Sequence, residues 1–566
     1  MEVKRLEQIR SKQHLKSARR RGSVLLVALL VVVMLSIIVT SVIASGENEM
    51  ERTVTQVQGD RALFAAESVA NIAVKELMAN TDFDGDGTVG SVSNDNNDAN
   101  DPALNPGTNA RATRADVSGE IVVTAMADND DAARAIEVRL TPGVAPTNAG
   151  TILLVVVNST ALDAQESAKR TLFQSWGYAV SLISESATQA QFDAAVRAAS
   201  VAYISETVTS GNVSTKLTSA TIGVITEESS LSDELGMSTS MTTFTGNTVN
   251  IINTTHYITK VFSAGTLTLF TANQPVRYLS GTLGSFTTLG RQVATTNPTF
   301  AIMERGATLT PSGTAAGRRV YLPFGNTGVD FTQLTTDGKT LVKRCIEWCL
   351  LPIAHYQLDD ASGTTASDAM KSHNGTLYGA TWGAGKLNGS AYFNGTTNYL
   401  SIADHANFRV TNALTIAGWI KASTWPADGN WASVILRKGE ANPCNWQLEV
   451  SAGKATLVLD DYDVYGIRGN TTLPLNTWTH VAATWDGATV RIYVNGVLDN
   501  TPTARAAPIA TDTRAVYLGG RSGNTDIVNG SVDDVRFYSR ALTAAEIAQI
   551  MQSTQPTVTK WTAVEP

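Results

Sequence analysis

The chain has 566 residues and a formal net charge of −8 at pH 7, with 43 Lys and Arg against 51 Asp and Glu. This length exceeds a single hydrophobic core and predicts several domains, and the acidic balance argues against nucleic acid as a partner, which needs a basic face. The six histidines lack the spacing of a zinc site, which argues against a zinc hydrolase.

A basic leader at residues 1–22 precedes an apolar stretch at 23–44 that holds no charge and no proline. About 22 residues rising 1.5 Å each span roughly 33 Å, which is enough to cross a bilayer. The leader carries eight Lys and Arg against Glu2 and Glu7, so the N-terminus is expected in the cytoplasm and the rest outside. Apolar residues continue at helical spacing, which predicts one helix over 23–80, amphipathic in its second half.

The sequence RRRGSVLLVALLVVVMLSII followed by GDRALFAAESVANIAV resembles the N-terminal region of PilX-type minor pilins, and less closely the K-type pseudopilins of type II secretion. The resemblance implies that a prepilin peptidase cuts between Gly22 and Ser23 and that the helix, first held in the inner membrane, then packs into the core of a filament. It also implies other pilin-like subunits and the filament assembly machinery as partners. Val27 stands where major pilins carry glutamate, which favours a minor subunit. An ordinary single-span anchor is the alternative.

Residues 81–142 are predicted to form an Asp- and Asn-rich loop and a small β region of a pilin-like head. Asp82, Asp84 and Asp86 match the first half of a calcium loop, but Ser93 occupies the place of the closing glutamate. A solvated acidic loop is the alternative. Residues 119–141 predict two strands that pack on the long helix, followed by a linker at 143–150.

Residues 151–352 alternate strands with helices and predict an α/β domain with a parallel sheet covered on both faces. The run loosely resembles class I glutamine-amidotransferase-like or flavodoxin-like domains, whose amidotransferase members use a cysteine on a tight elbow. Here that region holds Glu206 and no cysteine. Glu206, Glu227, Glu228 and His256 lie at strand ends, where α/β sites form, yet ordinary loop residues are the favoured interpretation. The domain is predicted to be a non-catalytic spacer or binding module.

The cysteine spacing argues for a structural role. Cys345 and Cys349 lie four residues apart on an expected helix, a marginal distance for a bridge. Two buried thiols are favoured over a disulfide.

Residues 353–552 show short alternating strands with Asn-Gly and Asp-Gly turns, the pattern of an all-β sandwich. The segments NTWTHVAATWDGATVRIYVNGVLDNT and GSVDDVRFYSRALTAAEIAQI, with several others in order, resemble the laminin-G-like, concanavalin A-like jelly roll. Residues 553–566 are expected to be a tail.

This second resemblance implies a carbohydrate or protein ligand and, often, one calcium ion. The matching metal positions are Asp368, Asp533 and Asp534, with turn capping as the alternative. Trp425, Trp431, Tyr462 and Tyr465 are candidate ligand-binding residues, because sugars stack on such rings; core packing explains them equally well. No paired carboxylates at glycosidase spacing occur, so catalysis is not expected.

Together these patterns predict a multidomain, non-enzymatic minor pilin-like subunit. It would display a lectin-like module that binds a glycan or a surface or matrix ligand, in the periplasm or outside the cell. A single-span membrane-anchored lectin outside any filament is the second hypothesis. An enzyme using Glu206, Glu227 or His256 is the third.

Overall fold

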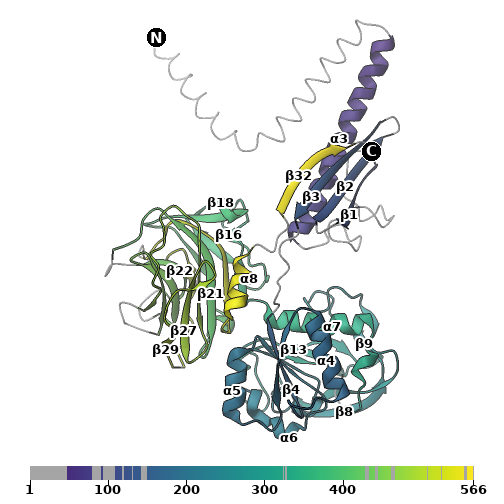
Figure 1. Ribbon diagram of the computed structural model, residues 1–566, viewed down its shortest axis with the longest axis vertical. Helices are drawn as coiled ribbons and strands as arrows, with labels where there is room; N and C mark the ends of the chain where they lie inside the picture. The colour runs from purple at the N-terminus through teal and green to yellow at the C-terminus, as the bar shows by residue number, and fades with distance from the viewer. Residues whose placement is uncertain are drawn as a thin grey trace. The chain divides into compact units, whose positions relative to one another are not determined.

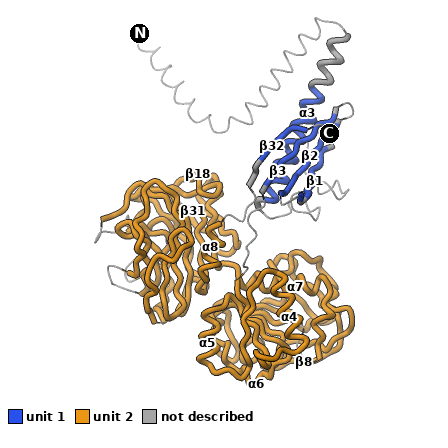
Figure 2. The backbone as a smooth tube through the Cα atoms, viewed as in Figure 1, with its two compact units in different colours: residues 1–145, 553–566 blue, residues 146–552 orange. Residues whose placement is uncertain are grey.

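The computed structural model divides into two compact units (Figure 2), residues 1–145 with 553–566, and residues 146–552. The residues that the structure describes are 47–79, 91–92, 109–117, 120–129, 132–141, 150–322, 324, 328–427, 432–439, 444–460, 466–506, 508–523, 526–552 and 557–564. The expected leader, the cleavage site at Gly22 and Ser23, the apolar stretch 23–44 and the acidic loop with Asp82, Asp84 and Asp86 all lie outside them. No helix among the described residues is long and apolar enough to cross a membrane.

The first unit is a helix packed on an antiparallel sheet (Figure 1). Its elements are α3 (Glu47–Ala79), β1 (Asn109–Val117), β2 (Glu120–Asn129), β3 (Ala132–Thr141) and β32 (Thr557–Val564), with sheet order β1-β2-β3-β32. Val69, Ala73 and Leu77 of α3 are buried against Val123 and Val138 of the sheet. The predicted hairpin over 119–141 is confirmed as β2 and β3. A Cβ at Gly59 would lie 2.5 Å from Nη2 of Arg134, at the end of an exposed and flexible side chain of β3.

The C-terminal segment is not a free tail. Residues Thr557–Val564 form strand β32, which pairs antiparallel with β3, with Val138 opposite Trp561. The valines and threonines of TVTKWTAV favour a strand, but the partner strand lies more than 400 residues earlier in the chain, beyond the reach of local pattern. The second unit is therefore inserted, in sequence, between two parts of the first.

The second unit begins with an α/β domain built on a nine-stranded sheet in the order β10-β9-β12-β13-β14-β7-β6-β4-β5. Its sheet strands are β4 (Thr151–Val156), β5 (Ala179–Ser184), β6 (Val201–Ile204), β7 (Gly223–Thr226), β9 (Thr248–Ile251), β10 (Gly265–Thr268), β12 (Thr287–Arg291), β13 (Pro298–Met303) and β14 (Arg319–Tyr321). Its helices are α4 (Ala164–Ser175), α5 (Gln189–Ala198), α6 (Ser210–Val213) and α7 (Thr336–Leu350), with short 3-10 turns η1 (Ser214–Leu217), η2 (Ser229–Leu231) and η3 (Phe331–Gln333). A separate two-stranded ribbon joins β8 (Ser238–Gly246) to β11 (Gln274–Leu283).

This sheet is mixed, whereas the sequence predicts a parallel one. Strands β5, β4, β6, β7 and β14 run parallel, but β13, β12, β9 and β10 continue the sheet antiparallel. Neighbouring residues of β4 point into two separate cores, which explains its unbroken apolar run. Helices α4 and α7 contribute to one core and α5 and α6 to the other, so helices cover both faces (Figure 1).

The rest of the second unit is a sandwich of two antiparallel sheets. One sheet has the order β18-β19-β31-β21-β26-β27-β28, with β15 on β31 and β29 on β27, and the other has the order β16-β17-β20-β30-β22-β23-β24-β25. The first contains β15 (Ala354–Tyr356), β18 (Thr381–Leu387), β19 (Gly389–Asn394), β21 (Leu414–Ala422), β26 (Thr479–Trp485), β27 (Thr489–Val494), β28 (Val497–Leu498), β29 (Thr503–Ala504) and β31 (Asn529–Tyr538). The second contains β16 (Thr365–Ala366), β17 (Gly375–Tyr378), β20 (Tyr399–Ile402), β22 (Ser433–Lys438), β23 (Trp446–Ser451), β24 (Lys454–Leu459), β25 (Ile467–Arg468) and β30 (Val516–Leu518).

One large apolar core fills the space between the two sheets. Trp446 and Trp485, the largest fully buried side chains, belong to it. A short 3-10 turn, η4 (Ala406–Phe408), lies at its edge, and helix α8 (Ala544–Met551) packs through Ile547 on the outer face of the first sheet.

Candidate functional site

The outer face of the eight-stranded sheet gathers polar and aromatic side chains. Along each strand alternate residues enter the core, as Leu400, Leu518 and Leu448 do. The residues between them form a row across neighbouring strands, because directly paired residues share a face. The register joins Thr376 to Ser401, Ser401 to Tyr517, Tyr517 to Arg437, and Arg437 to Gln447.

A stack of tyrosines stands on this face beside that row. Tyr378 of β17 and Tyr399 of β20 are paired across the strands, with ring centroids 4.8 Å apart and planes 14° apart. Tyr517 of β30 meets Tyr399 edge-on at 5.9 Å. Tyr378 is 48% exposed, whereas Tyr517 is buried. The stack therefore offers an open aromatic surface that leads into a buried polar region.

An arginine–aspartate cluster lies next to the tyrosines. Asp526 Oδ2 lies 2.7 Å from Arg521 Nε and 3.4 Å from Arg437 Nη1. Burial raises the pKa of Asp526 and lowers that of Arg437, because each loses hydration of its charged form. One carboxylate thus holds two guanidinium groups on this face.

Gln447 and Glu449 of β23 complete the region. The Gln447 amide donates to a Glu449 carboxyl oxygen, and burial raises the pKa of Glu449 to about 7. Gln447 Oε1 is buried and has no hydrogen-bond partner among the residues that the structure describes. A buried acceptor without a donor lowers the stability of the folded protein by about 1–3 kcal/mol. A hydrogen-bond donor from a bound molecule or from water would remove this cost. We call Tyr378, Tyr399, Tyr517, Arg437, Gln447, Glu449, Arg521 and Asp526 the tyrosine–arginine face.

Of the four aromatic residues predicted from sequence to bind a ligand, the structure describes Trp425. Trp425 donates its Nε1 to the Leu473 carbonyl at 2.9 Å and packs against the sandwich core, so it has a structural role. Trp431, Tyr462 and Tyr465 lie outside the described residues. The tyrosines that do meet, Tyr378 and Tyr399, sit on strands that are adjacent in space, and strand register is not readable from local sequence.

The three acids predicted to bind calcium in the sandwich do not form a shared ligand set. Asp368 accepts backbone N–H groups of His355, Met370, Ser372 and His373 at 2.9–3.2 Å, which fixes a loop. Asp534 pairs with Arg536 and with His355 Nε2.

Asp533 differs from these two acids. Its Oδ2 accepts the N–H groups of Lys386 and Leu387, while its buried Oδ1 has no hydrogen bond within the described part of the chain. Burial, with Asp534 and Asp359 nearby, raises the pKa of Asp533 to about 7. No group of three metal-ligating side chains occurs in the part of the chain that the structure describes. Because Asp368 and Asp534 are committed to other partners, the predicted set does not fit a calcium ion.

The α/β domain brings Glu206 and Glu227 together, as their positions at strand ends suggest, but around a lysine that sequence reasoning missed. Lys169 of α4 contacts Glu206 and lies 3.1 Å from Glu227, which also accepts from Tyr203. Burial raises the pKa of Glu227 well above its usual value, while the neighbouring Glu227 and Lys169 outweigh burial and lower that of Glu206. The three charged side chains are at most 1% exposed, so the cluster is an internal ion network closed to solvent.

Glu228 and His256 stay apart from that network. Glu228 accepts the Ser230 N–H at 2.7 Å as a local cap, and His256 packs edge-on to Trp348. Burial lowers the pKa of His256 to about 4, so it is neutral at pH 7. Cys345, Cys349 and Cys444 are free and buried, which confirms the preference for thiols over a disulfide.

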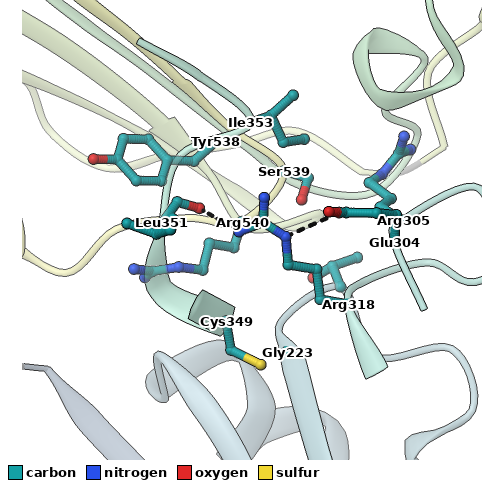
Figure 3. Close-up of a pocket in the computed structure, with 11 residues that line it drawn as sticks. Gly223, Glu304, Arg305, Arg318, Cys349, Leu351, Ile353, Tyr538, Ser539 and Arg540 are labelled. Carbon is teal, nitrogen blue, oxygen red and sulfur yellow. Dashed lines mark hydrogen bonds and ion pairs between the residues drawn. The ribbon is translucent and has the colours of Figure 1, made fainter. Parts of the chain in front are cut away.

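A small cavity of about 20 Å³ lies near the end of α7 (Figure 3). Arg318 occupies its middle and donates to the carbonyls of Trp348 at 2.6 Å and Leu351 at 3.0 Å, with Glu304 Oε2 at 3.1 Å. Space of this size holds about one water molecule. We therefore assign it to packing.

The sandwich matches a known protein family. Residues 394–548 match the family model described as the concanavalin A-like lectin/glucanases superfamily. The C-terminal domain is a concanavalin A-like jelly roll. The matched segment includes the strands that carry Tyr399, Arg437, Gln447 and Tyr517, while Tyr378 precedes it.

Solved structures give weaker likenesses. Domain 4 of AbnA, a GH43 extracellular arabinanase from Geobacillus stearothermophilus, in complex with arabinotriose, is 19% identical, covers 36% of this chain and 98% of its own, and has a TM-score of 0.30. The binding domain of botulinum neurotoxin serotype G is 15% identical, over 35% of this chain and 50% of its own, at a TM-score of 0.28. The serotype D ligand-binding domain, in complex with N-acetylneuraminic acid, is 16% identical with the same coverage and TM-score. The chain spans about half the length of these toxin domains, and a search of curated proteins found no match.

Proposed function

We propose that the jelly roll binds carbohydrate on its tyrosine–arginine face. The observation that carries this proposal is the Tyr378–Tyr399 stack, an open aromatic surface beside buried polar groups. Sugar rings present apolar C–H faces that pack on aromatic rings, while their hydroxyl groups satisfy amide and charged partners such as Gln447. The superfamily match and the arrangement of the two sheets support a binding role.

The test compares two matched tyrosine substitutions. Tyr378 and Tyr392 are 48% and 43% exposed on opposite sheets of the sandwich, so Tyr392→Ala controls for loss of an exposed ring. Full-length protein in detergent is applied to an array of neutral and acidic glycans. We expect Tyr378→Ala to weaken binding about tenfold, consistent with one lost stacking contact of roughly 1.4 kcal/mol, and Tyr392→Ala to leave it unchanged. Equal behaviour of the two variants would place binding elsewhere.

We further propose that the chain is a minor pilin-like subunit that carries this module on a type IV filament. A helix packed on a small antiparallel sheet in the first unit supports the proposal, together with the basic leader and apolar stretch of the sequence. In this proposal the leader is removed after Gly22, the protein enters the filament from the inner membrane, and unit two faces outward. Binding rather than catalysis is the proposed activity of the whole chain.

The N-terminal sequence and intact mass test the filament proposal. A chain that begins at Ser23 only when prepilin peptidase is present is the expected result. A chain that begins at Met1 with and without the peptidase contradicts it, and then supports a single-span membrane-anchored lectin.

A further inference from the structure

We propose that protonation of His405 loosens the attachment of the jelly roll to the α/β domain, so that the turn η4 acts as an acid-sensitive joint. This inference goes beyond the proposed function, because it concerns how the jelly roll is held and not what it binds. The argument uses the contacts that fix η4 and the contacts that η4 makes with the α/β domain.

One arginine of the α/β domain holds this turn of the jelly roll. Arg305 Nη1 donates to the carbonyls of Ala406 at 2.7 Å and Asn407 at 3.2 Å, and Nη2 donates to the carbonyl of Arg409 at 2.7 Å. One rigid guanidinium makes all of these bonds only while the carbonyls keep the conformation of the turn. Burial lowers the pKa of Arg305 to about 10, so the arginine itself stays charged at neutral and mildly acid pH.

His405 fixes the conformation of the turn. It is the N-cap residue of η4, and its Nδ1 accepts the N–H of Asn407 at 3.2 Å. A ring nitrogen that accepts a hydrogen bond carries no proton, so this bond exists only while the imidazole is neutral. Histidine is the side chain whose charge changes between about pH 5 and 8. Protonation turns Nδ1 into a donor that faces another donor, which removes the cap.

A second histidine lies against the first. The rings of His373 and His405 have centroids 4.7 Å apart, and Asn407 Nδ2 donates to His373 Nε2 at 3.3 Å. Burial and the neighbouring His405 lower the pKa of His373, so His373 remains a neutral acceptor. His405 is exposed, so its charged form stays hydrated. Mild acid therefore acts at His405, directly on the cap of the turn.

The carboxylates around the turn are already engaged. The charged groups on the elements that pack around the two histidines are Asp404, Arg409 and Lys438 of the jelly roll, Asp368 and Lys371 of the loop that carries His373, and Glu304, Arg305 and Arg318 of the α/β domain. Asp404 pairs with Arg409 and Lys438, and Glu304 pairs with Arg318. Asp368 accepts backbone N–H groups. A proton on His405 thus breaks the cap without meeting an uncommitted carboxylate among these groups.

The first measurement is amide hydrogen exchange of full-length protein in detergent at pH 7.5 and pH 5.5, corrected for the intrinsic exchange rate. Loss of one capping bond shifts a local equilibrium by about fivefold, so residues 406–409 are expected to exchange about fivefold faster at pH 5.5. Residues 416–420 of β21 serve as the internal reference and are expected to stay unchanged. Arg305→Gln removes the interdomain bonds and is expected to give fast exchange of the turn at both pH values.

Two matched histidine variants locate the titrating group. His405→Asn keeps an acceptor for the Asn407 N–H but gains no proton, so slow exchange is expected at both pH values. His256 in the α/β domain makes the same kind of bond, because its Nδ1 accepts the N–H of Ile258 at 3.3 Å. Burial lowers the pKa of His256 to about 4, so it stays neutral at pH 5.5. His256→Asn is therefore expected to respond to acid as the parent does.

The second measurement follows the attachment of the two domains. Spin labels are placed on full-length protein at Lys339→Cys and Lys421→Cys, two exposed positions in the α/β domain and the jelly roll, while Cys345, Cys349 and Cys444 are buried. Pulsed electron paramagnetic resonance gives the distribution of distances between the labels. We expect a narrow distribution at pH 7.5 and a broader one at pH 5.5 in the parent, and a narrow one at both in His405→Asn.

Three results overturn the inference. Exchange of residues 406–409 that does not respond to acid shows that the cap does not titrate. An acid response that persists in His405→Asn assigns the effect to another group. Faster exchange of the turn with an unchanged distance distribution shows that the turn loosens without releasing the domains, which refutes the joint.

Discussion

Lys169 Nζ and Glu227 Oε2 lie 3.1 Å apart, and both side chains are at most 1% exposed. Burial favours neutral lysine, but the carboxylates of Glu227 and Glu206 outweigh this effect and raise the pKa of Lys169. Burial raises the pKa of Glu227 well above its usual value, whereas the neighbouring Glu227 and Lys169 lower that of Glu206, so Glu206 is the main counter-charge to Lys169 in this network. It therefore stabilises the α/β domain only while all its members are present.

Replacing Lys169 tests this dependence. Lys169→Met keeps the volume but leaves Glu206 as an uncompensated buried charge, so we expect the free energy of unfolding to fall by about 3–5 kcal/mol. Chemical denaturation followed by tryptophan fluorescence measures the change. Adding Glu206→Gln is expected to restore part of the loss, and Lys339→Met, at an exposed position of α7, to stay within about 0.5 kcal/mol of the parent. A Lys169→Met protein as stable as the parent would show that the pair is solvated.

The stability of the sandwich is expected to depend on pH through Glu449. Its pKa is about 7 in the folded protein and about 4.5 when unfolded, so the folded state binds more protons between these values. The contribution of Glu449 to the free energy of unfolding is therefore fully present below pH 4.5. It falls by about 3 kcal/mol as the pH rises through 7. Glu449→Gln should flatten that part of the profile, measured by urea denaturation at several pH values. Asp193→Asn, at a half-buried position of helix α5 in the α/β domain, should leave the profile unchanged.

The pairing of β32 with β3 predicts an effect far from the site of mutation. Thr562→Pro removes a backbone donor opposite Glu137, so we expect faster amide hydrogen exchange over residues 132–141. Loss of about 1–3 kcal/mol of local stability corresponds to roughly a five- to 150-fold increase in exchange rate. Thr562→Ala keeps the donor and controls for the side chain. Unchanged protection of β3 in the proline variant would contradict the pairing.

Substitutions at Trp425 and Tyr378 are expected to affect different properties, stability and glycan binding. Trp425→Phe removes the hydrogen bond to the Leu473 carbonyl, so we expect a loss of stability of about 1–2 kcal/mol and unchanged glycan affinity. Tyr378→Ala should show the reverse, because an exposed ring contributes little to folding. Thermal unfolding and glycan binding, measured on both variants, check the two assignments together. Lower affinity in Trp425→Phe at unchanged stability would reverse them.

Local sequence patterns predicted the helices and strands more reliably than the contacts between them. The alternation of Ile136, Val138 and Leu140 identified a strand because burial repeats every second residue. The turns at Asn394-Gly395 and Asn495-Gly496 identified the sandwich for a similar reason, since their φ values of +77° and +78° at glycine are local requirements.

The missed residues all depend on contacts between distant segments. Lys169 lies on an amphipathic helix, where a lysine usually faces water. It is buried because the ends of two later strands place Glu206 and Glu227 against it. Tyr378 and Tyr517 are separated by 139 positions in the sequence, and their common face follows from strand order and register. The antiparallel half of the sheet was missed because β9, β10 and β12 are short strands without a sequence signal for direction.

The return of the chain to the first unit sets an order of events during synthesis. Roughly 400 residues separate β3 from β32, which takes about 20–80 s to translate at 5–20 residues per second. Throughout that interval the β3 edge has no fourth strand, and it gains one only after the α/β domain and the jelly roll have been made. A chain that ends before β32 therefore carries an unfinished first sheet, so the complete four-stranded sheet reports that the α/β domain and the jelly roll have been made.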